Sequence, residues 1–171
     1  MKILSQIRVK WIAYAVELLL ICIIQSTPNL LPAFLGVKPL LLPVFAISIA
    51  MFEGETTAMW FGVVAGMLMD ITSSSVFGFN TLMLMIICYI CGSLVVFLMR
   101  NNIVTAMVLG VGGLFAMELM RWLCFYVLWG DTKIWYYLYA IMLPQIVYSA
   151  VIMPIAFYFN RAIASHLSDE E

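Results

Sequence analysis

The chain has 171 residues, of which 65% are hydrophobic and only 10% are charged. A soluble domain contains roughly 45–50% apolar and about 25% charged residues, so this composition excludes a water-soluble fold. The net charge of −1 also excludes a broad basic surface of the kind that attracts nucleic acid. We therefore expect one multi-pass membrane domain over residues 1–171, with a short N-terminus (1–8) and a polar tail (160–171) in the cytoplasm.

Hydrophobic runs predict an all-α integral membrane protein, a six-helix transmembrane bundle, because a spanning helix needs about 20 apolar residues. The basic N-terminus could be mistaken for a signal peptide. No small-residue cleavage site follows it cleanly, so we expect a retained first helix. The predicted segments cover about residues 9–26, 38–52, 55–69, 79–99, 103–129 and 135–159.

The second and third segments are short for a bilayer. Each has about 14 residues between flanking acids or bases, which makes roughly 21 Å of helix. They could gain turns from residues 30–37 and 71–75, or form a short hairpin shielded by the other helices, where irregular backbone is tolerated. Removing this hairpin from the count leaves four spans and the same side for both termini.

Lysine and arginine positions predict that both termini are cytoplasmic, because cytoplasmic loops carry an excess of these residues. With the N-terminus inside, Lys38 and Lys133 lie outside. The residues on the cytoplasmic side are more numerous: Lys2, Arg8, Lys10, Arg100 and Arg161. Trp11, Trp129 and Trp135 suit the two membrane interfaces.

Two glycines four residues apart, Gly62 and Gly66, give the third segment a small-residue face that allows close helix approach. Such a face packs against a neighbouring helix of the same chain or, less commonly, against a partner. Asp70 follows on the same face, and Gly78 permits a flexible turn before the fourth segment. Asp70 either has a structural role, capping that segment or tying down the loop with Ser73, Ser74 or Ser75 as donors, or it anchors a partner or a small ligand at the outer face.

Three more ionisable groups are predicted inside the membrane. Glu118 and Arg121 lie three residues apart and share a helix face, which favours a structural ion pair over an ion or substrate site. Glu17 has no evident local partner, so it is either protonated or reaches Arg121 across the bundle. Gln25, Asn80, Gln145 and Tyr148 are further polar positions in or near the spans.

No residue pattern predicts catalysis or a bound cofactor. Cys88 and Cys91 form a CxxC pair, but no second pair exists and the only histidine, His166, lies in the tail. Cysteine in an apolar run behaves as a small hydrophobic residue, and we expect the same of Cys22 and Cys124. We expect no metal, no cofactor, no catalytic residue and no enzymatic activity.

Over nearly its whole length, the chain resembles the bacterial rod shape-determining protein MreD family. The family pattern is a Gly-xxx-Gly-xxx-Asp followed by a polar turn and a glycine, matched here by Gly62, Gly66, Asp70 and Gly78. The sequence Gln25-Ser26-Thr27 at the end of the first helix and Pro144 in the last one also fit. Many members have an acid after the proline that opens the second segment, whereas this chain has Leu40 after Pro39, so any role of that acid is not carried over.

The resemblance implies a non-enzymatic scaffold of lateral wall growth in rod-shaped bacteria. Members associate with MreC, a single-span protein with an extracytoplasmic coiled coil. They act with MreB, RodA and a class B penicillin-binding protein, in the cytoplasmic membrane. The fold of the family looks like that of the substrate-binding subunits of energy-coupling-factor vitamin transporters, which have six helices.

Two functions follow as alternatives. A scaffold would bind MreC and membrane lipids through small-residue and polar surfaces, with Gly62, Gly66, Asp70 and Gly78 as its core. A transporter subunit would instead need a polar pocket near the outer face, to which we expect Asp70, Asn80, Tyr136, Tyr137 and Gln145 to contribute. A lipid-linked wall precursor docking against the bundle is a third possibility that no particular residue favours.

Overall fold

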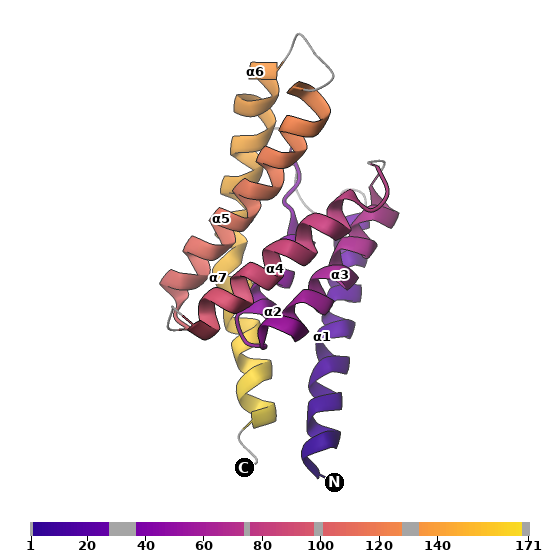
Figure 1. The fold of residues 1–171 in the computed structure, drawn as a ribbon, viewed down its shortest axis with the longest axis vertical. Coiled ribbons are helices and arrows are strands. Elements are labelled where there is room, and N and C mark those ends of the chain that lie inside the picture. The colour runs from indigo at the N-terminus through magenta and orange to yellow at the C-terminus, as the bar shows by residue number, and fades with distance from the viewer. Residues whose placement is uncertain (1, 28–36, 74–75, 98–100, 128–133, 169–171) are drawn as a thin grey trace.

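The computed structural model describes residues 2–27, 37–73, 76–97, 101–127 and 134–168, and it is helical throughout this part except for short turns and connections. Six continuous helical segments are present (Figure 1). The first four are α1 (Lys2–Ser26), α2 (Leu41–Ala50), α3 (Glu55–Thr72) and α4 (Phe79–Phe97). In the fifth, α5 (Ile103–Trp122) continues into a π-helical turn, η1 (Leu123–Val127). The sixth joins α6 (Ile134–Tyr137), the π-helical turn η2 (Leu138–Met142) and α7 (Leu143–Ser168).

Four of these segments are long and apolar enough to cross a membrane, as a multi-pass protein requires. They are Arg8–Ser26, Phe79–Phe97, Ile103–Phe125 and Leu138–Ser165, with mean hydropathies of 1.7 to 2.1. The shortest have 19 residues, or about 28 Å of helix, close to the ~30 Å hydrocarbon core. α3 has 18 residues but carries Glu55 and Asp70 near its ends, and it is not among the four.

The second predicted segment is not a span. α2 has ten residues, about 15 Å of helix, and every one of them is buried. It lies in the middle of the bundle, in contact with α1, α3, α4, α5 and α7. The expected run over 38–52 is shorter because residues 37–40 are not helical, so the shielded short helix describes this segment better than a spanning one.

Side chains from distant helices satisfy the backbone where the chain enters α2. The N–H of Leu40 donates to Ser149 Oγ of α7 at 2.9 Å, and the N–H of Leu42 donates to Gln25 Oε1 of α1 at 3.0 Å. Non-helical backbone at membrane depth requires partners of this kind, because lipid offers none. The bundle therefore accommodates a short helix inside it by supplying polar groups from its outer helices.

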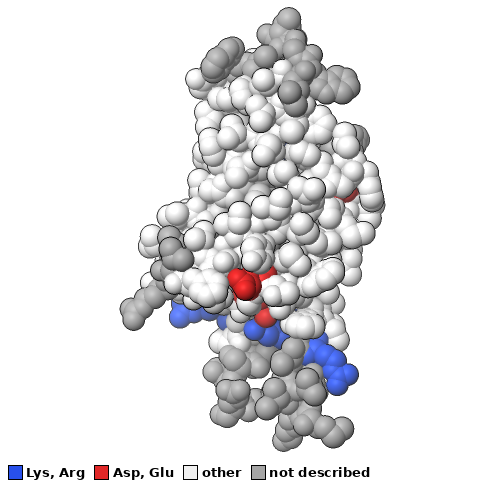
Figure 2. Space-filling model, in the orientation of Figure 1, with Lys and Arg blue, Asp and Glu red and all other residues white. Residues whose placement is uncertain are grey.

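α1 begins and α7 ends at the same end of the bundle, which we call the termini end (Figure 1). On the face drawn in Figure 2, lysine and arginine gather near this end, below a surface that is mostly uncharged. Lys10 Nζ lies 2.7 Å from Glu53 Oε1 there, and Arg8 and Arg161 are exposed. The side chains of Lys2, Arg100 and Lys133, used in the orientation argument, fall outside the described residues, as do Trp129 and the side chain of Trp135.

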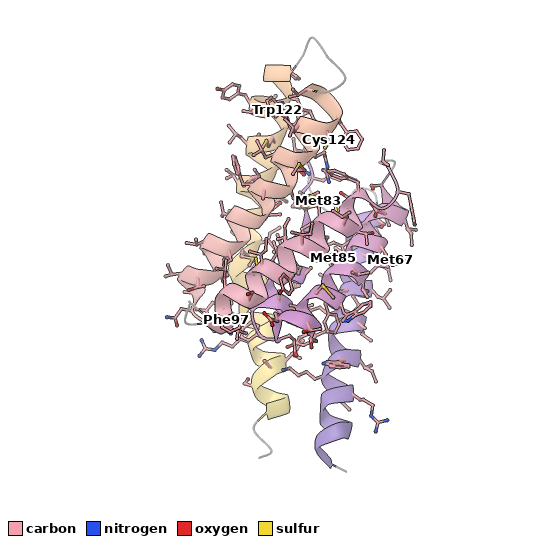
Figure 3. All side chains as sticks on the ribbon, viewed as in Figure 1. Met67, Met83, Met85, Phe97, Trp122 and Cys124 are labelled. Atoms are coloured by element: carbon pink, nitrogen blue, oxygen red, sulfur yellow. The ribbon has the colours of Figure 1, made fainter. Side chains whose placement is uncertain are left out.

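The outer surface of the bundle is apolar, as a lipid-facing surface must be. Met67 on α3 and Phe97 on α4, both labelled in Figure 3, are 46% and 69% exposed. The buried core is equally apolar, with Leu42, Ile47, Leu114 and Met153 almost fully enclosed. Cys88 and Cys91 are buried free thiols in α4, and the described residues contain no group of three or more side chains able to hold a metal ion.

Candidate functional site

The two glycines of α3 lie where α3 crosses α4. A Cβ atom added at Gly62 would lie 2.7 Å from the carbonyl oxygen of Leu84 and 2.9 Å from Cys88 Cβ. At Gly66 it would lie 2.3 Å from the Cα of Thr81. Only glycine fits at such separations, because the atoms it would meet include backbone. Both glycines are buried inside the chain's own bundle, which is the packing role considered first for this face.

Asp70 lies near the end of α3, shortly before α4 begins. The residue is 3% exposed, and its carboxylate accepts five hydrogen bonds from residues 78–81. Oδ2 accepts from the N–H of Gly78 (2.9 Å), the N–H of Thr81 (3.1 Å) and Thr81 Oγ1 (2.6 Å). Oδ1 accepts from the N–H and Nδ2 of Asn80, at 3.2 and 2.9 Å.

This geometry makes Asp70 the cap of α4, supplied from the preceding helix. The first N–H groups of a helix have no partner within it, and their positive dipole end favours an anion. Gly78 has a φ of +94°, a conformation that favours glycine, and it precedes the first helical residue of α4. Ser74 and Ser75, expected as donors to Asp70, lie outside the described residues.

Asn80 connects this cap to α5. Its Nδ2 donates to Asp70, and its Oδ1 accepts from Arg121 Nη2 at 2.9 Å. Arg121 Nη1 lies 2.8 Å from Glu118 Oε1, and Glu118 is fully buried. The residues singled out separately as Asp70 and as the Glu118–Arg121 pair thus belong to one polar network across α3, α4 and α5. No local pattern indicates this connection, because Asn80 and Arg121 are 41 residues apart.

Glu17 lies away from that network, at the junction of α1, α2 and α7, and does not reach Arg121. It is 5% exposed and lies beside Asn160, whose Nδ2 donates to Ser48 Oγ and to the carbonyl of Ala156, both at 3.1 Å. Within the described part of the chain, no hydrogen-bond partner is present for either carboxyl oxygen of Glu17, for Asn160 Oδ1 or for the Tyr14 hydroxyl. Glu17 is therefore a buried acid held among unsatisfied polar atoms.

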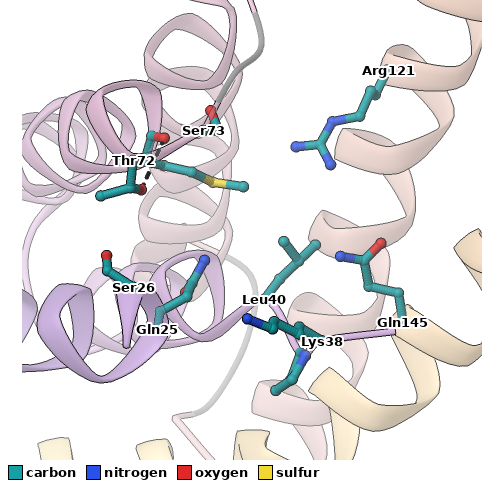
Figure 4. A pocket seen from close by; sticks show the side chains of 10 residues that line it. Gln25, Ser26, Lys38, Leu40, Thr72, Ser73, Arg121 and Gln145 are labelled. Carbon is teal, nitrogen blue, oxygen red and sulfur yellow. Dashed lines mark hydrogen bonds between the residues drawn. The ribbon is translucent and has the colours of Figure 1, made fainter. Parts of the chain in front are cut away.

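A pocket of about 410 Å³ opens beside the network, between the α1–α3 and α5–α7 sides of the bundle (Figure 4). Arg121 belongs to both the network and the pocket. Of the residues expected to form a polar pocket, Gln145 lines this one, whereas Asp70, Asn80, Tyr136 and Tyr137 are not among its lining residues. The lining comes from the end of α1 (Gln25, Ser26), from Lys38, Pro39 and Leu40, from the end of α3 (Met69, Thr72, Ser73), and from Arg121 and Gln145.

The comparison with protein families identifies the family to which the chain is similar. The model for "rod shape-determining protein MreD" matches residues 5–163. This range includes Glu17, the α3 glycines, the Asp70 cap and the Glu118–Arg121 pair. The comparisons with curated proteins and with solved structures found no significant match.

Proposed function

This chain belongs to the MreD family of rod shape-determining proteins, and from that premise we propose that it is a non-enzymatic membrane scaffold of the bacterial cell-elongation complex. In this role it binds MreC directly and supports lateral peptidoglycan synthesis, in one complex with MreB, RodA and a class B penicillin-binding protein. It resides in the cytoplasmic membrane with both termini in the cytoplasm. Membrane lipids surround it, and nucleic acid has no part in its action.

The observation that best supports a scaffold is that polar side chains within the helices bond to one another and connect three helices. Five hydrogen bonds converge on Asp70, and Asn80, Arg121 and Glu118 extend them to α5. Groups engaged in this way fix the relative positions of α3, α4 and α5. A fixed frame suits a protein that holds a partner in position, because its ionisable groups serve assembly.

Co-purification with MreC tests this role. We expect Gly66→Leu and Asp70→Ala to reduce the recovery of MreC while the protein stays in the membrane, because both disturb the frame. Val64→Leu is the matched control, since Val64 lies on α3 with an exposed side chain. Full recovery of MreC with both frame variants would refute a contribution of this frame to partner binding.

The pocket beside the network supports a second candidate, a substrate-binding membrane subunit of a vitamin-type transporter. Its volume of about 410 Å³ lies within the range of small-molecule sites, roughly 300–1,000 Å³. Under this proposal the bundle has the six-helix fold of energy-coupling-factor substrate-binding subunits. A vitamin-sized molecule that co-purifies tightly with the protein, identified by mass spectrometry, would favour this candidate. Its absence, together with retention of MreC, would favour the scaffold.

A further inference from the structure

The pocket beside the Asp70 network combines residues from four separate helices, or directly after them, and from the stretch that precedes α2. Gln25 comes from α1, Ser73 follows α3, Arg121 is in α5 and Gln145 is in α7, while Lys38 comes before α2. In Figure 4 the side chains of Arg121, Gln145 and Lys38 surround the same space. Side chains so distant in sequence share a pocket only because the bundle folds as it does.

Two cationic side chains line this pocket, one of them already paired with an acid outside the lining, because Arg121 forms an ion pair with Glu118. Lys38 and Arg121 line it, and the described lining residues include no acid. Lys38 is exposed and has no hydrogen-bond or ion-pair partner among the residues that the structure describes. Two hydrogen bonds hold the Arg121 guanidinium in place. Its Nη1 donates to Glu118 Oε1, and its Nη2 donates to Asn80 Oδ1. A guanidinium has five N–H donors, so Arg121 keeps donors for a further acceptor.

Neutral donors complete the lining. The Oε1 atom of Gln25 accepts from the N–H of Leu42, which directs the amide nitrogen of Gln25 elsewhere. Figure 4 shows that nitrogen on the side of the open space, and the amide of Gln145 turned toward the same space from the other side. Two cations and two amides thus converge from several directions. This set suits a ligand that carries many acceptor oxygens and negative charge.

We propose that this pocket binds the phosphate group of a phosphorylated ligand, with Lys38 and Arg121 as its two cationic partners. Phosphate offers acceptor oxygens in several directions, which the free N–H groups of Arg121 and the two amides can donate to, and a negative charge that attracts the unpaired Lys38. The volume of about 410 Å³ leaves room for more than the phosphate itself. Either a phosphorylated lipid or a soluble phosphate could supply this group. The site does not depend on which of the two proposed functions holds.

Thermal unfolding of the full-length protein tests the site, in a maltoside detergent and a phosphate-free buffer. The probes are inorganic phosphate and a short-chain phosphatidic acid, and diacylglycerol of the same chain length is the uncharged control. A ligand that binds only the folded state raises the unfolding midpoint as its concentration rises. We expect a saturable rise with phosphatidic acid alone if the source is a lipid, and with inorganic phosphate as well if free phosphate suffices.

Lys38→Gln should weaken this binding about tenfold, because a hydrogen bond to a charged group is lost. Lys38→Arg should restore most of it. Arg161→Gln, which removes one exposed positive charge at the termini end, is the matched control and should bind as the unaltered protein does. Gln145→Leu is a second variant, for the case in which Lys38→Gln by itself lowers the unfolding midpoint in the absence of any probe. We expect Gln145→Leu to weaken binding as well.

Three results would overturn the proposal. They are no rise with either phosphate probe, an equal rise with diacylglycerol, and an undiminished rise in both Lys38→Gln and Gln145→Leu. Recovery of MreC by the same variants separates this proposal from the scaffold. We expect Lys38→Gln to retain MreC, whereas Gly66→Leu loses it.

Discussion

Three buried acids in this chain are stabilised to very different degrees. Asp70 accepts five hydrogen bonds at the start of α4, and Glu118 has one oxygen paired with Arg121. Glu17 lies beside Asn160, but neither of its oxygens makes a hydrogen bond of ordinary length within the described residues. A buried carboxylate without a donor or cation is costly, whereas a paired one is costly only when its partner is removed. Neutralising Glu17 and neutralising Glu118 should therefore have opposite effects.

We expect Glu17→Gln to leave the thermal unfolding midpoint unchanged or to raise it. The introduced amide is neutral and can donate to Asn160 Oδ1, which has no partner in the described part of the chain. Glu118→Gln should instead destabilise the protein by about 1–3 kcal/mol, because Arg121 loses its ionic partner. Unfolding of both variants in the same detergent measures the difference. A larger loss for Glu17→Gln than for Glu118→Gln would contradict this interpretation of the two acids.

At the residue scale, spacing identified the groups but not the connection between them. The three-residue separation of Glu118 and Arg121 follows from helix geometry alone, and so does the shared face of Gly62, Gly66 and Asp70. The bond between Asn80 and Arg121 depends on how α4 packs against α5, which no local spacing contains. The same holds for Glu17, whose position next to Asn160 depends on the packing of α1 against α7.

At the element scale, α3 and α4 approach each other so closely that Gly62 and Gly66 leave no room for a side chain. Gly92 on α4 contributes from the other side, where an added Cβ would lie 3.0 Å from Ala58 Cβ. Each helix thus places a small residue opposite the other. Small residues let helix backbones approach closely in lipid, where packing and polar bonds replace the hydrophobic effect as the driving force.

We expect Gly66→Ala to destabilise the protein by about 1–3 kcal/mol, because the new methyl group would meet the backbone of Thr81 at 2.3 Å and force the helices apart. Gly112→Ala on α5 is the matched control. Nothing lies within 4 Å of an added Cβ there, so this change should be neutral or stabilise the helix by up to about 1 kcal/mol. Unfolding midpoints of the two variants give the comparison. Equal effects would show that the close approach of α3 and α4 contributes nothing to stability.

Hydrophobic length predicted the long helices well and α2 poorly. The runs that became α1, α4, α5 and α7 are long enough for their apolar character alone to predict them. α2 is as hydrophobic as a spanning segment but lies wholly inside the bundle. An apolar run of 10–14 residues is ambiguous between these outcomes. The buried outcome depends on Gln25 and Ser149, two residues distant in the sequence, which accept hydrogen bonds from the backbone at the start of α2.

At the scale of the whole molecule, the arrangement of the helices places the start of α1 and the end of α7 together (Figure 1). Arg8 and Lys10 belong to the first part of α1, and Arg161 belongs to the last part of α7. Positive residues are retained on the cytoplasmic side, so this charge distribution supports the proposed orientation.

A green fluorescent protein fused after Glu171 should therefore fluoresce, and alkaline phosphatase fused at the same position should remain inactive. A phosphatase fusion truncated after Thr27, at the other end of α1, is the control and should be active. Active phosphatase after Glu171 would reverse the orientation, while leaving the fold as described.

The bonds at the start of α2 also bear on the order of biogenesis. The Leu40 amide depends on Ser149, a residue synthesised 109 positions later, and Ser48 within α2 receives its bond from Asn160, later still. When residues 41–50 leave the ribosome, Gln25 of α1 has already been made, but Ser149 and Asn160 do not yet exist. The central helix of the protein is therefore among the first to be translated and the last to be completed, and its final placement waits for the C-terminal helix to arrive.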